Sequence, residues 1–199
     1  MVIVIYKQYI HSYFFMTRDH ALTLVREHVK NENLVKHMLA AEAVMRALAR
    51  KFGEDEDAWG LAGLLHDIDW EETQSTPELH SLKSKEYLTA AEVDPAVVHA
   101  IYVHNHMHGI EPQSRMEKAL YSAEELTGLI VASALVQPDK KLAAVEAQSV
   151  LKKFKQPAFA RGVDREIILR AEGWLEMSLL ELIELELRAM QGIAAELGL

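Results

Sequence analysis

The chain has 199 residues, a formal net charge of −9 and no cysteine. This length suffices for one domain with a buried core. The negative charge argues against a nucleic-acid-binding surface, which needs a basic face, but not against a small anionic substrate. Without cysteine there is no disulfide, thiolate metal site or cysteine nucleophile, so a metal would be bound by His, Asp and Glu. The same absence fits a cytoplasmic protein.

The first fifteen residues, MVIVIYKQYIHSYFF, differ in character from the rest of the chain. They are apolar and β-prone, but they are too short for a membrane span and lack the basic leader of a signal peptide. Met16 precedes Thr17-Arg18-Asp19, which is typical of a helix cap and first turn. We therefore expect a domain over residues 16–199, preceded by an N-terminal arm over residues 1–15 or by an over-long reading frame.

Beyond residue 16 the helical period dominates. Asn33 is expected to cap one helix, Gly53 to end it, and residues 73–78 to form a loop. The pattern predicts an all-α fold, a single-domain helical bundle with short loops. The last helix has a broad apolar face that either closes the bundle or pairs with a second copy, and closure is the better fit. The predicted helices span residues 17–30, 33–51, 55–65, 80–91, 95–105, 114–136, 141–154, 164–173 and 178–197.

The adjacent pair His66-Asp67 directly follows an apolar run. Buried charges are costly unless they are paired or hold a metal, and imidazole and carboxylate are both good ligands for a divalent cation. His37 shares a helix face with apolar residues, and Glu124 lies on an apolar helical stripe. One divalent cation held between His37, His66, Asp67 and Glu124 would compensate both carboxylates.

Each of these residues also has a purely structural interpretation. A histidine on an apolar face is more often a hydrogen-bonded core residue than a ligand, and His37 alone would indicate little. Glu124, with Glu125 beside it, fits a solvated helix face about equally well when taken in isolation. The metal site is favoured by the combination in order: a histidine, then His-Asp at the end of an apolar helix, then an acidic residue on a later amphipathic helix.

That ordered combination resembles the HD-domain superfamily of metal-dependent phosphohydrolases. Its H…HD…D pattern matches His37, His66-Asp67 and the acidic position 124, and nearly the whole chain from residue 16 is similar to small bacterial HD proteins of the HDIG type. The resemblance implies an all-α HD fold and a divalent cation, which is Mn, Mg, Co, Ni, Fe or Zn. The resembling segments are residues 63–69, 103–105, 119–130, 149–155 and 161–166.

The chain departs from the superfamily at its last ligand, which is usually aspartate and here is Glu124. The extra methylene lengthens the reach of the carboxylate by roughly 1.5 Å. Glutamate still binds metals, even in bidentate fashion. The departure leaves three outcomes open: an altered geometry, a weaker affinity, or a site that has lost activity.

A second cluster of polar residues follows the His-Asp pair. In the superfamily, histidines between that pair and the last acid bind a second metal or contact the substrate phosphate, and His80 and His104 match those positions best. Asp69 would be an outer partner of the site or a proton donor. His104 and His108 would share a helix face if the helix continued that far, but Gly109 should end it near them. His106 and His108 are expected to be surface residues.

The predicted function is metal-dependent hydrolysis of a phosphate ester, a nucleotide or another small phosphorylated metabolite. Asp67 would bind the metal and orient the attacking water, while His80 and His104, if protonated, would neutralise phosphoryl charge. Neither a nucleic-acid nor a membrane partner is expected, and a homo-oligomer is possible. The alternative is an HD-fold regulatory module with weak or no activity that binds a metal or nucleotide. A purely structural helical protein is the third interpretation, but it leaves the inward-facing carboxylates without a counter-charge.

Overall fold

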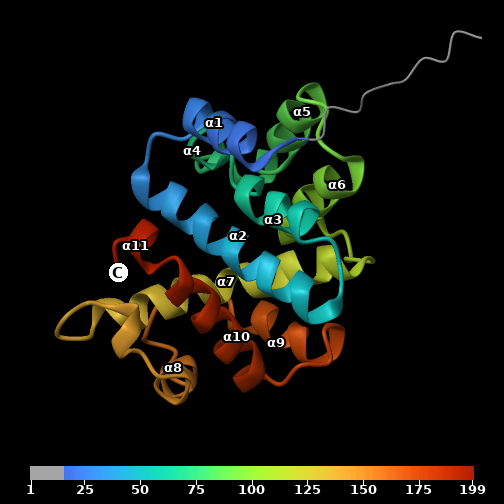
Figure 1. Ribbon diagram of the computed structural model, residues 1–199. Helices are drawn as coiled ribbons and strands as arrows, with labels where there is room; N and C mark the ends of the chain where they lie inside the picture. The colour runs from blue at the N-terminus through green and yellow to red at the C-terminus, as the bar shows by residue number, and fades with distance from the viewer. Residues whose placement is uncertain (1–15) are drawn as a thin grey trace, which may run out of the picture.

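The computed structural model describes residues 16–199, so the predicted N-terminal arm lies outside the described residues. Within this range every regular element is a helix and none is a strand, which confirms the predicted all-α fold (Figure 1). Short 3₁₀ turns at Pro77–Leu79, His106–His108 and Leu142–Ala144 connect the longer helices. These are α1 (Arg18–His28), α2 (Glu32–Phe52), α3 (Glu56–Leu65), α4 (Trp70–Thr73), α5 (Leu82–Ala90), α6 (Pro95–His104), α7 (Arg115–Leu135), α8 (Ala147–Phe154), α9 (Arg165–Trp174), α10 (Leu179–Gly192) and α11 (Ala194–Leu197).

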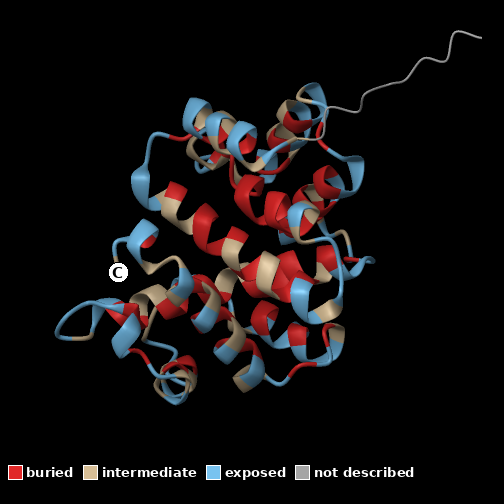
Figure 2. Ribbon diagram, viewed as in Figure 1, coloured by how far each residue is buried: buried red, intermediate tan, exposed pale blue. Residues whose placement is uncertain are grey.

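Helix α2 crosses the middle of the molecule, with α1, α3, α5 and α6 on one side and α8 to α11 on the other (Figure 1). It packs most extensively against α3, and it also contacts α7 and α10. Buried residues concentrate along α2, α3 and α7, whereas the outer helices turn exposed residues to solvent (Figure 2). None of the helices in the described part of the chain is both long and apolar enough to cross a membrane.

The sequence explains why α2 begins and ends where it does. The side chain of Asn31 accepts a hydrogen bond from the backbone N–H of Asn33 at 2.9 Å, so Asn31 is the cap and the predicted cap at Asn33 was wrong by two residues. Gly53 ends the helix in the left-handed conformation, at φ 70°, as predicted. Helix α2 is therefore fixed at both ends.

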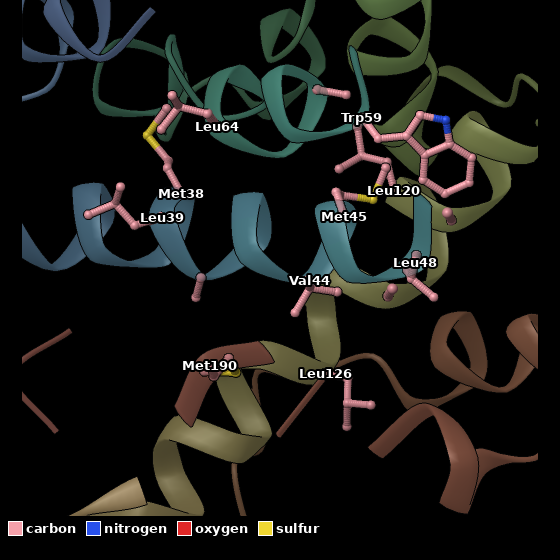
Figure 3. Close-up of a cluster of buried hydrophobic side chains, with 14 of the residues drawn as sticks. Met38, Leu39, Val44, Met45, Leu48, Trp59, Leu64, Leu120, Leu126 and Met190 are labelled. Carbon is pink, nitrogen blue, oxygen red and sulfur yellow. The ribbon is translucent and has the colours of Figure 1, made fainter. Parts of the chain in front are cut away.

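The apolar core gathers around both faces of α2 (Figure 3). Met38 and Met45 of α2 and Met190 of α10 are buried in it, and the unbranched thioether side chain of methionine adapts readily to irregular packing. Helix α10 lies against α2, α7 and α8 and buries its apolar face there, as expected for a helix that closes the bundle. The largest fully buried side chains include Met38, Met45, Leu48, Leu64, Leu120, Leu126 and Leu129.

The structure differs most from the predicted helices at three places, and by one or two residues at several other helix ends. Helix α5 begins at Leu82 rather than at residue 80, because the His80 carbonyl accepts hydrogen bonds from the Asn105 and His108 side chains and Ser81 turns to φ 65°. The predicted helix 141–154 begins as a 3₁₀ turn and becomes α-helical only in α8. The predicted helix 178–197 is interrupted at Ile193, between α10 and α11. The polar contacts at His80 that move the start of α5 leave no periodic signal in the sequence.

Gly63 sets the distance between α2 and α3. A Cβ atom added there would lie 2.5 Å from the carbonyl oxygen of Ala41, which is backbone and cannot rotate away. We expect Gly63→Ala to force the two helices apart and to lower the free energy of unfolding by about 1–3 kcal/mol, measured by urea denaturation. Gly173→Ala is the matched control, since a Cβ there meets nothing within 4 Å and should stabilise α9 by about 0.5–1 kcal/mol. Equal effects at the two positions would contradict this account.

Candidate metal centre

Three of the four predicted metal ligands, His37, His66 and Asp67, bring their donor atoms together, and Glu124 adjoins this group through His37. His37 comes from the first half of α2, His66 caps the C-terminus of α3, Asp67 follows it, and Glu124 lies in the middle of α7. The Nε2 atoms of His37 and His66 are 3.1 Å apart. The Nε2 atom of His37 is 3.6 Å from Asp67 Oδ2 and 3.4 Å from Glu124 Oε2. The ligand assignment remains a prediction: the donor atoms of His37, His66 and Asp67 all lie within 4.8 Å of one another, whereas Glu124 contacts the group at His37.

His80 and His104 form a second group of donors on the other side of Asp67. Their Nε2 atoms are 3.1 Å apart and lie 3.3 Å and 3.7 Å from Asp67 Oδ1. Asp67 therefore turns one carboxylate oxygen toward His37 and His66 and the other toward His80 and His104. The single carboxylate is shared by two clusters that could each hold a cation.

Hydrogen bonds at the far ring nitrogens orient the imidazoles. The Nδ1 atom of His66 faces the Gly63 carbonyl at 2.8 Å, and that of His104 faces the Ile101 carbonyl. A carbonyl only accepts, so each Nδ1 carries the proton and each Nε2 presents its lone pair to the centre. The Nδ1 atom of His37 contacts the Thr127 hydroxyl at 3.3 Å. Such outer partners fix the tautomer and raise the basicity of metal-binding histidines.

Asp69 contributes to the site through His80. Its Oδ1 lies 2.7 Å from His80 Nδ1, and its Oδ2 accepts the backbone N–H of Ser84 at 3.0 Å. The Asp69 side chain is fully buried and does not line the cavity above the centre. Of the two roles predicted for Asp69, this geometry favours the outer partner that orients His80 over a proton donor to substrate.

The electrostatics of the centre suit a cation. Burial opposes a charge on His37 and His80, but neighbouring carboxylates outweigh it and raise the pKa of each to about 9. Burial lowers the pKa of His66 to about 4, so this ring is neutral. The surrounding histidines overcome the burial of Asp67 and hold its pKa well below the ordinary value. In the metal-free protein, two imidazolium protons thus take the place of the positive charge that a cation would bring.

The two acidic residues on α7 behave differently from each other. Burial raises the pKa of Glu124, but its hydrogen bond and charge interaction with His37 prevail and lower it. Burial together with the charge of Glu124 raises the pKa of Glu125 to about 7. Glu124 is therefore an ionised member of the cluster, and Glu125 is a second carboxylate beside it with no imidazole of its own.

The donor set fits a divalent cation. Donor atoms bound to one cation at about 2.1 Å lie about 3.0–3.4 Å from each other. The separations that His37 makes with its neighbours, 3.1 to 3.6 Å, are close to this range. The residues combine imidazole nitrogen and carboxylate oxygen, a set that suits borderline and hard metals such as Mn, Fe, Co, Ni and Zn.

A cavity of about 370 Å³ opens above the centre. Trp70, Asn105 and Glu125 line it although they were not predicted as site residues, and His106, exposed as predicted, also borders it. His108, also expected at the surface, is instead half-buried and donates to the His80 carbonyl. No lysine or arginine of residues 16–199 is among the lining residues. No spacing rule points to these positions, because they come from loops and helix ends that only the tertiary fold brings together. The other lining residues are Leu34, His37, Asp67, Pro77, His80, His104, Met107 and Glu124.

Comparison with known protein families agrees with this geometry. Residues 34–135, about half of the chain, match the model of the HD domain. The chain belongs to the HD-domain family. The matched range contains both clusters of the candidate centre, and HD domains are metal-dependent phosphohydrolases that bind divalent cations. The predicted superfamily is thereby confirmed.

One curated relative gives a more distant likeness. The chain is 29% identical over 140 residues to ribonuclease Y of Sulfurovum sp. (strain NBC37-1). The match covers 68% of this chain but 27% of that protein, so the HD protein spans about a quarter of the relative's length. No solved structure matches the chain.

Proposed function

We propose that this HD-domain protein hydrolyses small phosphate esters with the help of divalent cations bound at Asp67. The observation that carries the proposal is the position of Asp67, whose two carboxylate oxygens face separate pairs of histidines at the base of the cavity. Residues His37, His66 and Glu124 would hold one cation with Asp67 Oδ2. Residues His80 and His104 would hold a second with Asp67 Oδ1, or would contact the phosphate directly.

Bound cations would supply Lewis-acid activation of the phosphoryl group and a water of lowered pKa. The chain's own residues set the geometry for this chemistry. Asp69 and the backbone carbonyls behind the histidines hold the ring orientations, so the donors need no rearrangement. Asp67 also offers a carboxylate oxygen that can accept a hydrogen bond from the attacking water.

The cavity supports a small substrate. Its volume, about 370 Å³, lies at the lower end of the range of about 300–1,000 Å³ for small-ligand pockets. Trp70, half-buried with its ring centroid 4.9 Å from that of His80, lines the cavity and offers an aromatic ring against which a planar group could pack. A nucleotide or another small phosphorylated metabolite suits these features.

Cleavage of RNA is a second candidate function, because part of the chain is similar to a protein named ribonuclease Y. A polynucleotide strand needs basic contacts along its phosphates. The net charge of −9 and the lack of lysine and arginine among the described cavity residues therefore favour the small substrate. A short single-stranded RNA belongs in the substrate panel as the direct comparison.

The proposal is tested with purified, metal-depleted protein reloaded with Mn²⁺, Co²⁺, Ni²⁺ or Mg²⁺. The substrates are p-nitrophenyl phosphate, a set of nucleoside monophosphates and a short RNA. We expect release of inorganic phosphate that stops on chelation and returns with added metal. Hydrolysis that survives both chelation and Asp67→Ala would show that the activity does not come from this centre. Tight binding of metal or nucleotide without turnover would instead support the regulatory module.

The variant Glu124→Asp tests whether Glu124 serves an intact metal site or has impaired one. The Glu124 carboxylate reaches 3.4 Å from His37, and removal of one methylene withdraws it by about 1.5 Å. We expect metal affinity to fall by about 10–100-fold, measured by titration with competing chelator. Glu184→Asp, on the exposed face of α10, is the control and should bind metal normally. A gain of phosphatase activity in Glu124→Asp would instead mean that glutamate has impaired an aspartate-type site.

A further inference from the structure

Glu125 is a carboxylate in the cavity that the metal centre does not use. It follows Glu124 on α7, so the two side chains point about 100° apart around the helix axis. Glu124 turns toward His37, whereas Glu125 Oε2 accepts the backbone N–H of Asp164 at 3.3 Å, just before α9. Glu125 thereby lies on the cavity wall between the centre and the α8–α9 loop.

The protonated histidines that line the described cavity, His37 and His80, contact Asp67 and Glu124 rather than Glu125. No lysine or arginine lines the described cavity, and the histidines nearest the centre face Asp67 and Glu124. Like charges placed together in a partly buried site are strongly unfavourable. A hydroxyl or amino group, in contrast, can donate a hydrogen bond to a carboxylate oxygen.

We infer that Glu125 selects substrates by charge. It disfavours a phosphate ester that carries a second anionic group beside the reacting phosphate, and it favours one that carries a hydroxyl or amino group there. The inference rests on the proposed function, since it assigns the substrate class of the same site. It makes Glu125 a specificity residue and gives it no part in holding the cation.

Two compounds that differ at one carbon provide the test. Glycerol 2-phosphate and 2-phosphoglycerate have the same skeleton, but a hydroxymethyl group in the first is a carboxylate in the second. Both are assayed with the metal-loaded full chain at pH 8.5. The variant is Glu125→Gln, which removes the charge but keeps an oxygen to accept the Asp164 N–H. Glu184→Gln, at an exposed position, controls for the change in net charge.

We expect the wild type to prefer glycerol 2-phosphate and Glu125→Gln to raise the relative kcat/KM for 2-phosphoglycerate by about tenfold or more. The ratio should not change in Glu184→Gln. An unchanged ratio in Glu125→Gln, with both compounds hydrolysed, would overturn the inference and leave the proposed function standing.

Failure of the proposed function gives a different result. If the metal-loaded wild type hydrolyses no phosphate ester, the same comparison is made on the dissociation constants of the two compounds, measured by calorimetry. A shift of their ratio in Glu125→Gln would support charge selection in a site without turnover. An unchanged ratio, or no binding of either compound, would overturn the inference as well.

Discussion

Asp67→Asn should remove metal-dependent hydrolysis and most of the metal binding. Among residues 16–199, Asp67 is the one carboxylate that faces both histidine pairs, at 3.3 to 3.7 Å, so its loss affects both possible cation positions at once. Loss of an outer partner of a metal ligand already reduces affinity or activity by 10–100-fold. For a shared ligand we expect a reduction of more than about 100-fold in kcat/KM, with bound metal measured by elemental analysis.

Asparagine keeps the shape of Asp67 while it removes the charge, so the fold should be retained, and circular dichroism checks this. Asp139→Asn is the matched control, because Asp139 is exposed and only accepts a hydrogen bond from the Lys141 N–H. It should leave metal content and activity unchanged. An Asp67→Asn variant with the metal content of the wild type would remove the main support for the proposed centre.

Glu186→Met should stabilise the protein. Glu186 lies in α10 with no exposed surface, and neither carboxyl oxygen has a hydrogen-bond partner among residues 16–199. A buried polar group left without a hydrogen-bond partner costs about 1–3 kcal/mol, and an apolar residue of similar volume removes that cost. We expect a gain of about 1–3 kcal/mol in the free energy of unfolding. For a chain of this size, the melting temperature should rise by about 2–4 °C per kcal/mol.

The gain should depend on pH in a defined direction. Burial, and to a lesser extent the charge of Glu124, raise the pKa of Glu186 well above its ordinary value of 4.5. The folded wild type therefore keeps a proton that the unfolded chain releases, and its stability falls as pH rises from 4.5 toward the raised pKa. The advantage of Glu186→Met should consequently be larger at pH 8 than at pH 5.

Urea denaturation in the presence of a chelator measures this difference without a contribution from metal binding. Glu184→Met, two residues earlier on the exposed face of α10, is the control and should change stability little at either pH. A loss of stability in Glu186→Met, or a gain that does not vary with pH, would show that an internal water or another partner satisfies the carboxyl.

The sequence predicted the helical fold because amphipathic helices leave a periodic pattern, and caps such as Gly53 mark where they end. It predicted the centre because His37, His66-Asp67 and Glu124 recur in the order of a known superfamily. The helix ends were less predictable. His80 was expected to begin a helix, but its ring and carbonyl are held by Asp69 and Asn105, which belong to other segments.

The spacing of residues in the sequence also could not predict which other residues surround the centre. Trp70 and Asn105 reach the cavity from a short helix and a helix end, so neither belongs to a periodic stripe. In the sequence, Glu125 is notable only as the neighbour of Glu124. Its position depends on the packing of α7 against α9, which a single sequence does not specify.

The two histidines whose Nδ1 atoms face backbone carbonyls, His66 and His104, both lie at the C-terminal ends of helices. His66 caps the last turn of α3 and His104 is the last residue of α6, so two helices end at the same point. The C-terminal end of a helix carries a partial negative charge from its dipole, which attracts cations and repels anions. Together with Asp67 and Glu124, the two helix ends favour positive charge at the centre, which protonated His37 and His80 or a bound cation provides. The centre therefore holds positive charge in either state, and only the carrier of that charge changes when a cation replaces the protons.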